Sequence, residues 1–295
     1  MPFRLLLKYL CLLPLTLLAG CITLGKAPEA PVTPPAKPVV ALVLGGGAAK
    51  GFAHIGVIKA LEAQGIVPDI VVGTSAGAVV GSMYAAGKSG FELQSLAIAI
   101  DESQVSDWSL PDRGVMKGEA LAAFINKAVG NVTMDRFPKK FGAVATDLGS
   151  GEPIVFRSGD VGMAVRASSS VPGVFQPVSI RGREYVDGGL VSPVPVQFAR
   201  EMGASFVIAV DISNKPANSR TRSSFEILMQ TFAIMGQSLN RHELPQADVV
   251  IRPDISLLAS ADFKTRHQAV LEGEKAAAKE MPTLKAKLEQ WRERR

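Results

Sequence analysis

The sequence predicts an α/β domain built on a parallel sheet, and three observations carry this prediction. Short apolar runs of strand length alternate with longer stretches of helical spacing, strand-helix-strand-helix, within about fifty residues. The first run, 39–44, is continuously apolar, as in a strand buried on both faces. The chain has 295 residues, 47% of them hydrophobic, which is enough for one large core.

The individual elements follow in chain order. A helix is expected over 50–64, because Ile55, Ile58 and Leu61 share one face and Gly65 is a typical stop. A strand over 69–72 and a helix over 76–86 come next. We expect further strands at 141–145, 153–156, 184–186 and 205–210, a mainly helical stretch at 91–126, a polar and mobile loop at 214–223, and a helix at 225–239.

The N-terminus has the pattern of a secretory signal. Arg4 and Lys8 precede the apolar run 9–18, and the small residues Ala19 and Gly20 follow, so 1–20 is expected to be removed. The alternative is an uncleaved membrane anchor. Residues 18–21, Leu-Ala-Gly-Cys, resemble the lipobox of bacterial lipoproteins, in which Cys21 becomes the lipid-bearing first residue.

The segment 21–38 is rich in Pro and Ala and reads as a semi-rigid tether between the lipid and a folded body that begins near Val39. Residue 22 is Ile, not the Asp that resembles an inner-membrane retention signal. By this analogy the protein is lipid-anchored in the bacterial cell envelope, at the outer membrane facing the periplasm if the source is Gram-negative. The body divides into a core at 39–213 and a mainly helical extension of the same domain at 214–295.

Charge and composition exclude several classes of function. The net charge is +5, or about +3 once the signal is removed, which is too weak and too spread for nucleic-acid binding. The mature body has no cysteine beyond Cys21, so it forms no internal disulfide. Histidines and acidic residues form no dense cluster, and we expect neither a metal nor a cofactor.

Ser75 stands in the pattern Gly-x-Ser-x-Gly, from Gly73 to Gly77, between a predicted strand and a predicted helix. This is the setting of a nucleophile elbow, in which the serine hydroxyl points out above the sheet. The following helix points its N–H groups toward developing negative charge. A tight turn without chemistry is the alternative.

A nucleophilic serine needs a base, and the sequence offers two kinds. His54 lies in the first helix, while His242 and His267 lie far downstream in polar surroundings, where a surface histidine is the simpler interpretation. Asp187 ends a predicted strand before Gly188 and Gly189 and could take the proton directly. An ordinary Asp, with a pKa of about 3.9, is a weak base and would need a desolvated site.

A glycine-rich loop, Gly45 to Gly51, joins the first strand to the first helix. Its backbone N–H groups can converge on a phosphate or an oxyanion. A P-loop is excluded because Lys50 is followed by Gly51 and Phe52. A dinucleotide fingerprint is excluded because a required glycine is replaced whether the count starts at Gly45 or Gly46.

Together these pieces resemble the patatin-like phospholipase family. Its pattern is a glycine-rich loop with Arg or Lys before the last Gly, then Gly-x-Ser-x-Gly, then Asp-Gly-Gly or Asp-Gly-Ala. The stretches GFAHIGVIKAL, VATDLGSGEPIVF, ASSSVPGVFQPV and VIAVDIS add to the resemblance, which covers about 39–213.

The resemblance implies a three-layer α/β/α fold with a mainly parallel sheet, and a catalytic Ser–Asp dyad that uses no histidine. Ser75 would be the nucleophile and Asp187 the proton acceptor. The amides of Gly46, Gly47 and Ala48 would form the oxyanion hole. The family often has a third glycine where Ala48 stands, and an alanine resists positive φ. His54 would pack behind the oxyanion loop.

The expected function is hydrolysis of lipid esters, as a phospholipase A, lysophospholipase or carboxylesterase, at a membrane reached through Cys21. Asp147 and Asp211, at predicted strand ends, are expected to stabilise turns. Three alternatives stay open: an acyltransferase with the same dyad, a non-enzymatic lipid-binding envelope lipoprotein, and a Ser-His-Asp hydrolase that uses His242 or His267. The stretch 90–126, including Trp108, either covers the site and contacts lipid or belongs to core and surface loop.

Overall fold

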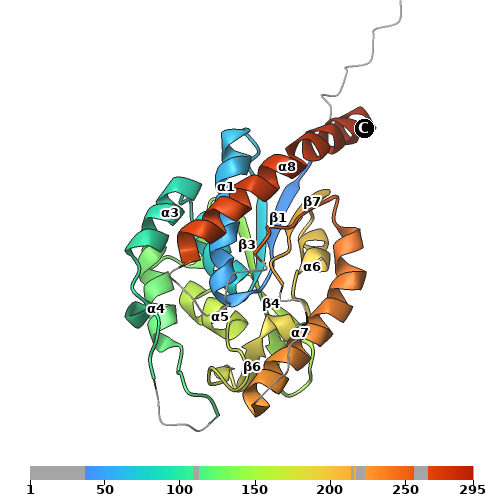
Figure 1. Ribbon diagram of the computed structural model, residues 1–295. Helices are drawn as coiled ribbons and strands as arrows, with labels where there is room; N and C mark the ends of the chain where they lie inside the picture. The colour runs from blue at the N-terminus through green and yellow to red at the C-terminus, as the bar shows by residue number, and fades with distance from the viewer. Residues whose placement is uncertain (1–36, 109–112, 214–215, 217–222, 256–264, 295) are drawn as a thin grey trace, which may run out of the picture. The chain divides into compact units, whose positions relative to one another are not determined.

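A central sheet of eight strands organises the described part of the chain (Figure 1). The computed structural model describes residues 37–108, 113–213, 216, 223–255 and 265–294. The spatial order of strands is β5-β6-β3-β2-β1-β7-β8, and β4 pairs with β3 outside this path. The strands are β1 (Val40–Leu44), β2 (Ile70–Thr74), β3 (Lys140–Asp147), β4 (Pro153–Phe156), β5 (Val178–Ile180), β6 (Arg183–Asp187), β7 (Phe206–Val210) and β8 (Val249–Ile251).

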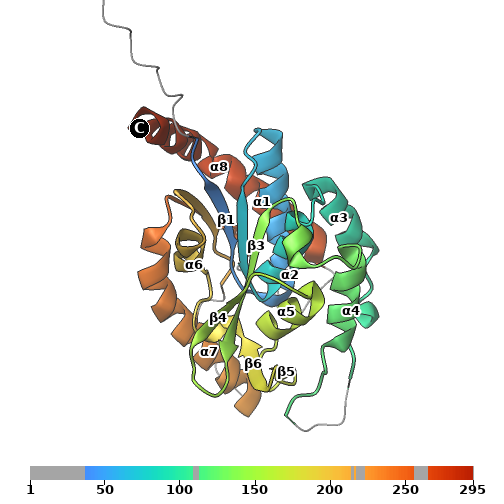
Figure 2. The ribbon, with the colours of Figure 1, turned by 180° about the vertical axis from the view of Figure 1, so that it is seen from behind.

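Helices cover both faces of this sheet (Figures 1 and 2). The α-helices are α1 (Phe52–Ala63), α2 (Ala76–Ala85), α3 (Gly90–Ala99), α4 (Glu119–Ala128), α5 (Val161–Ser168), α6 (Val196–Glu201), α7 (Ser224–Glu243) and α8 (Arg266–Glu293). Short 3-10 helices are η1 (Ala48–Gly51), η2 (Glu102–Gln104), η3 (Met134–Arg136), η4 (Gly188–Leu190) and η5 (Leu244–Gln246).

Strand β1 explains why the fold has three layers. Its side chains alternate between the two faces of the sheet. Leu42 and Leu44 join a large core with residues of α1, α2, α3 and α8, whereas Ala41 and Val43 join a second core with α6. A strand with a core on each side has no polar position, which accounts for its continuous apolar sequence. The expected three-layer α/β/α arrangement is confirmed.

The sheet is parallel at its centre and antiparallel at one side. Strands β1, β2, β3, β7 and β8 run parallel, while β4 and β6 are antiparallel to β3, and β5 is antiparallel to β6. Strands β5 and β6 form a hairpin through Arg181 and Gly182, whose φ angles are 51° and 79°. Two positive φ angles are typical of the two-residue turns that match the twist of a hairpin.

The pairing around β3 brings two strand ends together. Val144 pairs with Thr74 of β2 and with Val155 of β4, while the next residue, Ala145, pairs with Asp187 of β6 and again with β4. Because a strand has only two edges, β2 and β6 must share the edge opposite β4. They run toward each other along it and stop at consecutive positions. The residues that follow Thr74 and precede Gly188 are therefore neighbours in space.

The C-terminal part of the chain packs against the large core. Helix α8 runs beside α1 (Figure 1), and a side chain at either Gly56 or Gly273 would overlap the backbone of the facing helix. An ion pair between Lys59 and Glu274 links the same two helices. Among the described residues, every buried residue of the cores lies between Val40 and Leu288, so a chain that starts at residue 37 contains all of these.

Several expectations can now be compared with the structure. The stretch expected to be mainly helical, 91–126, contains most of α3, η2 and most of α4, but it is interrupted: α3 ends at Ala99 and α4 begins only at Glu119, after Gly118 at a φ of 79°. The signal, Cys21 and most of 21–38 lie outside the described residues, as does most of the loop 214–223. In the part of the chain that the structure describes, no helix combines the length and apolarity needed to cross a membrane.

Candidate active site

Ser75 occupies a strained turn between β2 and α2. Its φ is 54°, a left-handed value that is costly for a residue with a side chain and that clusters at functional sites. The flanking glycines are required by close approach. A side chain on Gly77 would overlap the carbonyl oxygen of Leu44, and one on Gly73 would overlap the backbone of Gly77. This geometry is that of a nucleophile elbow.

A second serine holds this turn. The hydroxyl of Ser168, at the end of α5, accepts the backbone N–H of Ser75 at 2.9 Å and donates to the carbonyl of Val144 at 2.5 Å. Ser168 is fully buried, so both bonds are shielded from water. Ser168 lies in the stretch ASSSVPGVFQPV quoted for the resemblance, but the sequence assigned it no role, since a serine at a helix end has no distinctive pattern. Its contacts fix the elbow to β3, the strand that also receives β6.

Asp187 is held at the end of β6 by its backbone and side chain. Its N–H donates to the carbonyl of Ser170 at 2.9 Å, and its own carbonyl accepts the hydroxyl of Thr146 at 2.8 Å. The carboxyl oxygen Oδ1 accepts the N–H of Gly189 at 2.7 Å. A side chain on Gly188 would overlap the carbonyl of Val144, which explains the first glycine after the acid.

The Asp187 carboxyl is buried beside Ser75. Burial raises its pKa from the ordinary 3.8 to about 6, and hydrogen bonding from the Ser75 side chain and the Gly189 N–H offsets part of that rise. Its other oxygen, Oδ2, has no partner among the described residues at full hydrogen-bond geometry, so the contact with Ser75 is a loose one. Catalytic hydrogen bonds are often loose before substrate binds. The desolvation that a basic Asp requires is therefore present.

In the glycine-rich loop, one of the three backbone N–H groups predicted to form the oxyanion hole is already hydrogen-bonded within the protein. The N–H of Gly45 donates to Val210 at 3.0 Å, and that of Gly46 donates to Pro193 at 2.9 Å. In this conformation Gly46 therefore does not offer its N–H to an oxyanion, contrary to the prediction. Of the three predicted oxyanion-hole amides, those of Gly47 and Ala48 remain. Ala48 has a φ of 52°, the left-handed conformation that alanine resists.

The remaining residues of the loop motif are structural neighbours of the elbow. Gly51 is buried, and a side chain there would lie 2.7 Å from the Cβ of Ala76, the first residue of α2. Lys50 is half-buried in η1, and burial lowers the pKa of its ammonium group. The loop motif and the elbow thus pack directly on each other.

None of the three histidines has the position of a general base. His54 is fully buried, and its Nε2 donates to the carbonyl of Gly45 at 2.8 Å, behind the glycine-rich loop. Burial lowers the pKa of His54 to about 4, so the ring is neutral. His242 near the end of α7 and His267 at the start of α8 have exposed side chains, whereas Ser75 and Asp187 are buried.

Asp147 and Asp211 lie at strand ends in local turns. Asp147 accepts the N–H groups of Gly149 and Ser150 and forms an ion pair with Arg183, and the Ser150 backbone bond is the main cause of its lowered pKa. Asp211 accepts the N–H of Ser213 at 3.1 Å. These contacts are those of turn-stabilising residues.

A buried glutamate near the site was not anticipated. Glu243 of α7 accepts the hydroxyl of Ser192 at 2.6 and 2.9 Å, and burial raises its pKa to about 7. The carbonyl of Ser192 in turn accepts the hydroxyl of Thr74, the residue before Ser75. Glu243 therefore connects α7 to the elbow through Ser192 and supports the loop that follows Asp187.

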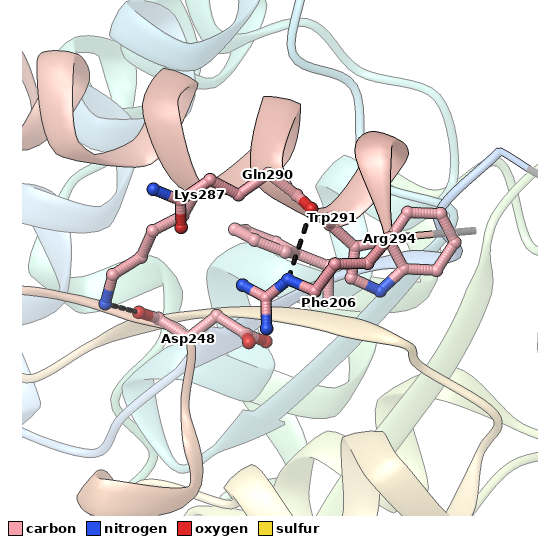
Figure 3. A pocket seen from close by; sticks show the side chains of 6 residues that line it. All are labelled: Phe206, Asp248, Lys287, Gln290, Trp291 and Arg294. Atoms are coloured by element: carbon pink, nitrogen blue, oxygen red, sulfur yellow. Dashed lines mark hydrogen bonds between the residues drawn. The ribbon is translucent and has the colours of Figure 1, made fainter.

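A cavity of about 410 Å³ lies elsewhere, at the start of β7 and the end of α8 (Figure 3). Its polar side chains are occupied by the protein itself: Lys287 donates to the carbonyl of Asp248 at 2.6 Å and Arg294 to that of Gln290 at 3.3 Å. Phe206 begins a strand parallel to β1, so the cavity is at the opposite end of the sheet from Ser75. It is a packing gap between α8 and the sheet.

Comparison with known proteins agrees with this geometry. A family model described as patatin-like phospholipase matches residues 42–200. An uncharacterized NTE family protein of Mycobacterium bovis is 37% identical over 183 residues, which are 61% of this chain and 51% of that protein. Patatin-like phospholipase domain-containing protein 6 of Mus musculus is 31% identical over 229 residues, 75% of this chain and 16% of that protein.

The fold also resembles a solved structure. VipD from Legionella pneumophila superimposes with a TM-score of 0.57 at 15% identity, covering 84% of this chain and 67% of that one. At this identity the similarity establishes the fold alone. The chain spans about half the length of the first curated relatives it matches.

Proposed function

Because this chain belongs to the patatin-like phospholipase family, we propose that it hydrolyses lipid esters through a dyad of Ser75 and Asp187. One observation carries the proposal. The strained, buried Ser75 directly follows β2, the desolvated Asp187 ends β6, and these two strands meet on the same edge of β3. A tight turn without chemistry needs neither the strain nor a buried acid beside it. Attachment to the outer membrane through Cys21 stays a prediction of the sequence.

The proposed reaction has two halves. Ser75 Oγ attacks the ester carbonyl carbon while its proton passes to Asp187, and the N–H groups of Gly47 and Ala48 bind the resulting oxyanion. The carbon–oxygen bond breaks, and the alcohol leaves with the proton from Asp187. Water then attacks the acyl-enzyme, gives a proton to Asp187 and releases the acid. The same proton returns to Ser75, so the enzyme is restored.

Covalent labelling tests the nucleophile directly. We expect a fluorophosphonate probe to label the chain 37–295 on Ser75, because the elbow places an activated hydroxyl where an ester-like electrophile is expected to bind. Mass spectrometry of the labelled peptide locates the adduct. Ser82→Ala is the matched control, since Ser82 is a buried serine of α2 whose hydroxyl donates to the carbonyl of Val79 in its own helix.

Labelling that is lost in Ser75→Ala and kept in Ser82→Ala supports the dyad. A well-folded wild type that takes no label and hydrolyses no ester contradicts the proposed function.

The pH dependence of hydrolysis follows from Asp187. Its pKa of about 6 in the folded protein means that below pH 6 the carboxyl carries a proton and cannot accept one from Ser75. We expect kcat/KM to fall about tenfold per pH unit below that value and to reach a plateau above it. Glu243→Gln is the control, because burial raises the pKa of Glu243 to about 7 but this residue reaches the elbow only indirectly, through Ser192. If the fall of kcat/KM below pH 6 disappears in this variant, the ionising group that controls activity is Glu243 and not Asp187.

A further inference from the structure

Helix α7 exposes large apolar side chains to water and buries small or polar ones. Its buried residues are Gly236, Asn240 and Glu243, which are small or polar. Ile227 and Ile234, two helical turns apart, are 55% and 53% exposed, and Phe225 and Met235 are exposed as well. Residues 227–240 carry no charged side chain. An ordinary surface helix has the reverse pattern, so the outer face of α7 fits an apolar partner.

This helix packs on the loops that build the candidate active site. Gly236 lies against Pro193, whose carbonyl accepts the N–H of Gly46. Leu228 lies against Gly173. Gly173 belongs to the segment 168–176, which begins with the serines that hold Ser75 and Asp187. The segment 168–176 therefore contacts both α7 and the residues of the dyad.

A second exposed apolar group flanks the same segment. Trp108 is 76% exposed and pairs with Met116, which pairs in turn with Phe175. The segment 168–176 thus lies between Trp108 and α7. In Figures 1 and 2, the start of α4 and the start of α7 lie toward the end of the molecule that carries β6, away from the C-terminal end of α8.

We propose that α7 and Trp108 dock the protein on a lipid surface, with the site entrance facing that surface. The proposal rests on the hydrolysis of lipid esters proposed above. A partner that touches both α7 and Trp108 lies across the segment that leads to Ser75. A protein there would block the entrance, whereas a bilayer would supply the substrate. Tryptophan and uncharged helix faces are also the groups that favour the membrane interface.

The dimensions fit a helix that lies on the membrane. The uncharged segment 227–240 spans roughly 21 Å at 1.5 Å per residue, which is shorter than a hydrocarbon core of about 30 Å. The exposed charges Glu226 and Arg241 stand at its two ends. Both charged side chains can therefore stay in water while the isoleucines between them enter the lipid.

Vesicle binding tests the docking surface separately from catalysis. The chain 37–295 with Ser75→Ala is sedimented with vesicles of phosphatidylcholine and phosphatidylglycerol in a 4:1 ratio. We expect Ile227→Ser with Ile234→Ser to weaken binding about tenfold or more, because two half-exposed isoleucines no longer enter lipid. The matched control is Val67→Ser with Val132→Ser, on the loops before β2 and β3, where the two valines are 55% and 41% exposed.

Fluorescence gives a second readout. The chain has two tryptophans, so Trp291→Phe leaves Trp108 as the sole emitter. Its emission is expected to shift to shorter wavelength on vesicles and to be quenched by brominated lipid. Equal binding by the isoleucine and valine variants, or no shift of Trp108, would overturn the proposal. So would a concentration-dependent dimer that the isoleucine substitutions dissociate, since α7 would then serve a second copy.

Esterase activity on a soluble short-chain ester separates the two proposals. Normal turnover in the chain with Ser75, together with no vesicle binding, overturns docking and leaves the dyad standing. Vesicle binding that depends on Ile227 and Ile234, without any turnover or fluorophosphonate labelling, supports docking and contradicts the proposed function.

Discussion

Replacing Asp187 by Asn is expected to lower kcat for ester hydrolysis by roughly 10²–10⁴-fold. The amide oxygen can still accept the N–H of Gly189, so the side chain keeps its position, but it cannot take the proton of Ser75. The fold should not suffer. Burial raises the pKa of Asp187 to about 6, so above pH 6 the ionised carboxyl opposes folding, and a neutral Asn removes that cost. We expect Tm at pH 8 to be equal or higher.

The matched control for Asp187→Asn is the double variant His242→Ala with His267→Ala. Both histidines are exposed, and we expect kcat to change less than twofold when they are removed. The opposite result, with activity retained in Asp187→Asn and lost in the double variant, would establish a histidine as the base and contradict the dyad.

Gly273→Ala is expected to lower the free energy of unfolding by about 3 kcal/mol or more. The new Cβ would overlap the carbonyl oxygen of Ala53, so α8 must move away from α1. The large core contains Ala269, Ala277 and Leu284 of α8, and such a movement opens it. Urea unfolding followed by circular dichroism measures the change, and Gly56→Ala should have a similar effect because its Cβ would overlap Val270 of the facing helix.

Gly236→Ala provides the control for this substitution. Gly236 is also a buried helical glycine, but its Cβ would lie 3.4 Å from Pro193 Cγ, a tolerable contact. Alanine is the better helix former by about 1 kcal/mol, so this variant is expected to be as stable as the wild type or slightly more stable. Equal losses in Gly236→Ala and Gly273→Ala would mean that the overlap at the α1–α8 crossing is not the cause.

The parts of the fold that the sequence predicted correctly are those with local signals. Strand β1 is apolar along its whole length because it has a core on each side, and Gly73 and Gly77 mark the elbow because no side chain fits there. Helix α8 was not predicted as an element. It has little amphipathic pattern and contains Pro282. Its position depends on the close contact between α1 and α8 at Gly56 and Gly273, which only the folded chain reveals.

The relation between Ser75 and Asp187 was beyond local sequence reasoning. Ser75 follows β2 and Asp187 ends β6, but only the pairing with Val144 and Ala145 shows that the two strands stop at adjacent positions. Ser168 and Glu243 were missed for the same reason, since their partners are distant in the chain. Gly46 was misjudged because its N–H donates to Pro193, a residue with no motif.

Because β2 and β6 meet at β3, the contact between Ser75 and Asp187 depends on the register in which β6 pairs with β3. Successive residues of a strand face opposite sides, so a slip of one residue in the pairing of β6 would turn Asp187 away from Ser75 without changing any side chain of the dyad. Within the hairpin, the count from Val178 to Tyr185 is fixed by the turn at Arg181 and Gly182. An inserted residue in that turn would change how β5 pairs with β6, whereas the side on which Asp187 lies is set by the pairing of β6 with β3.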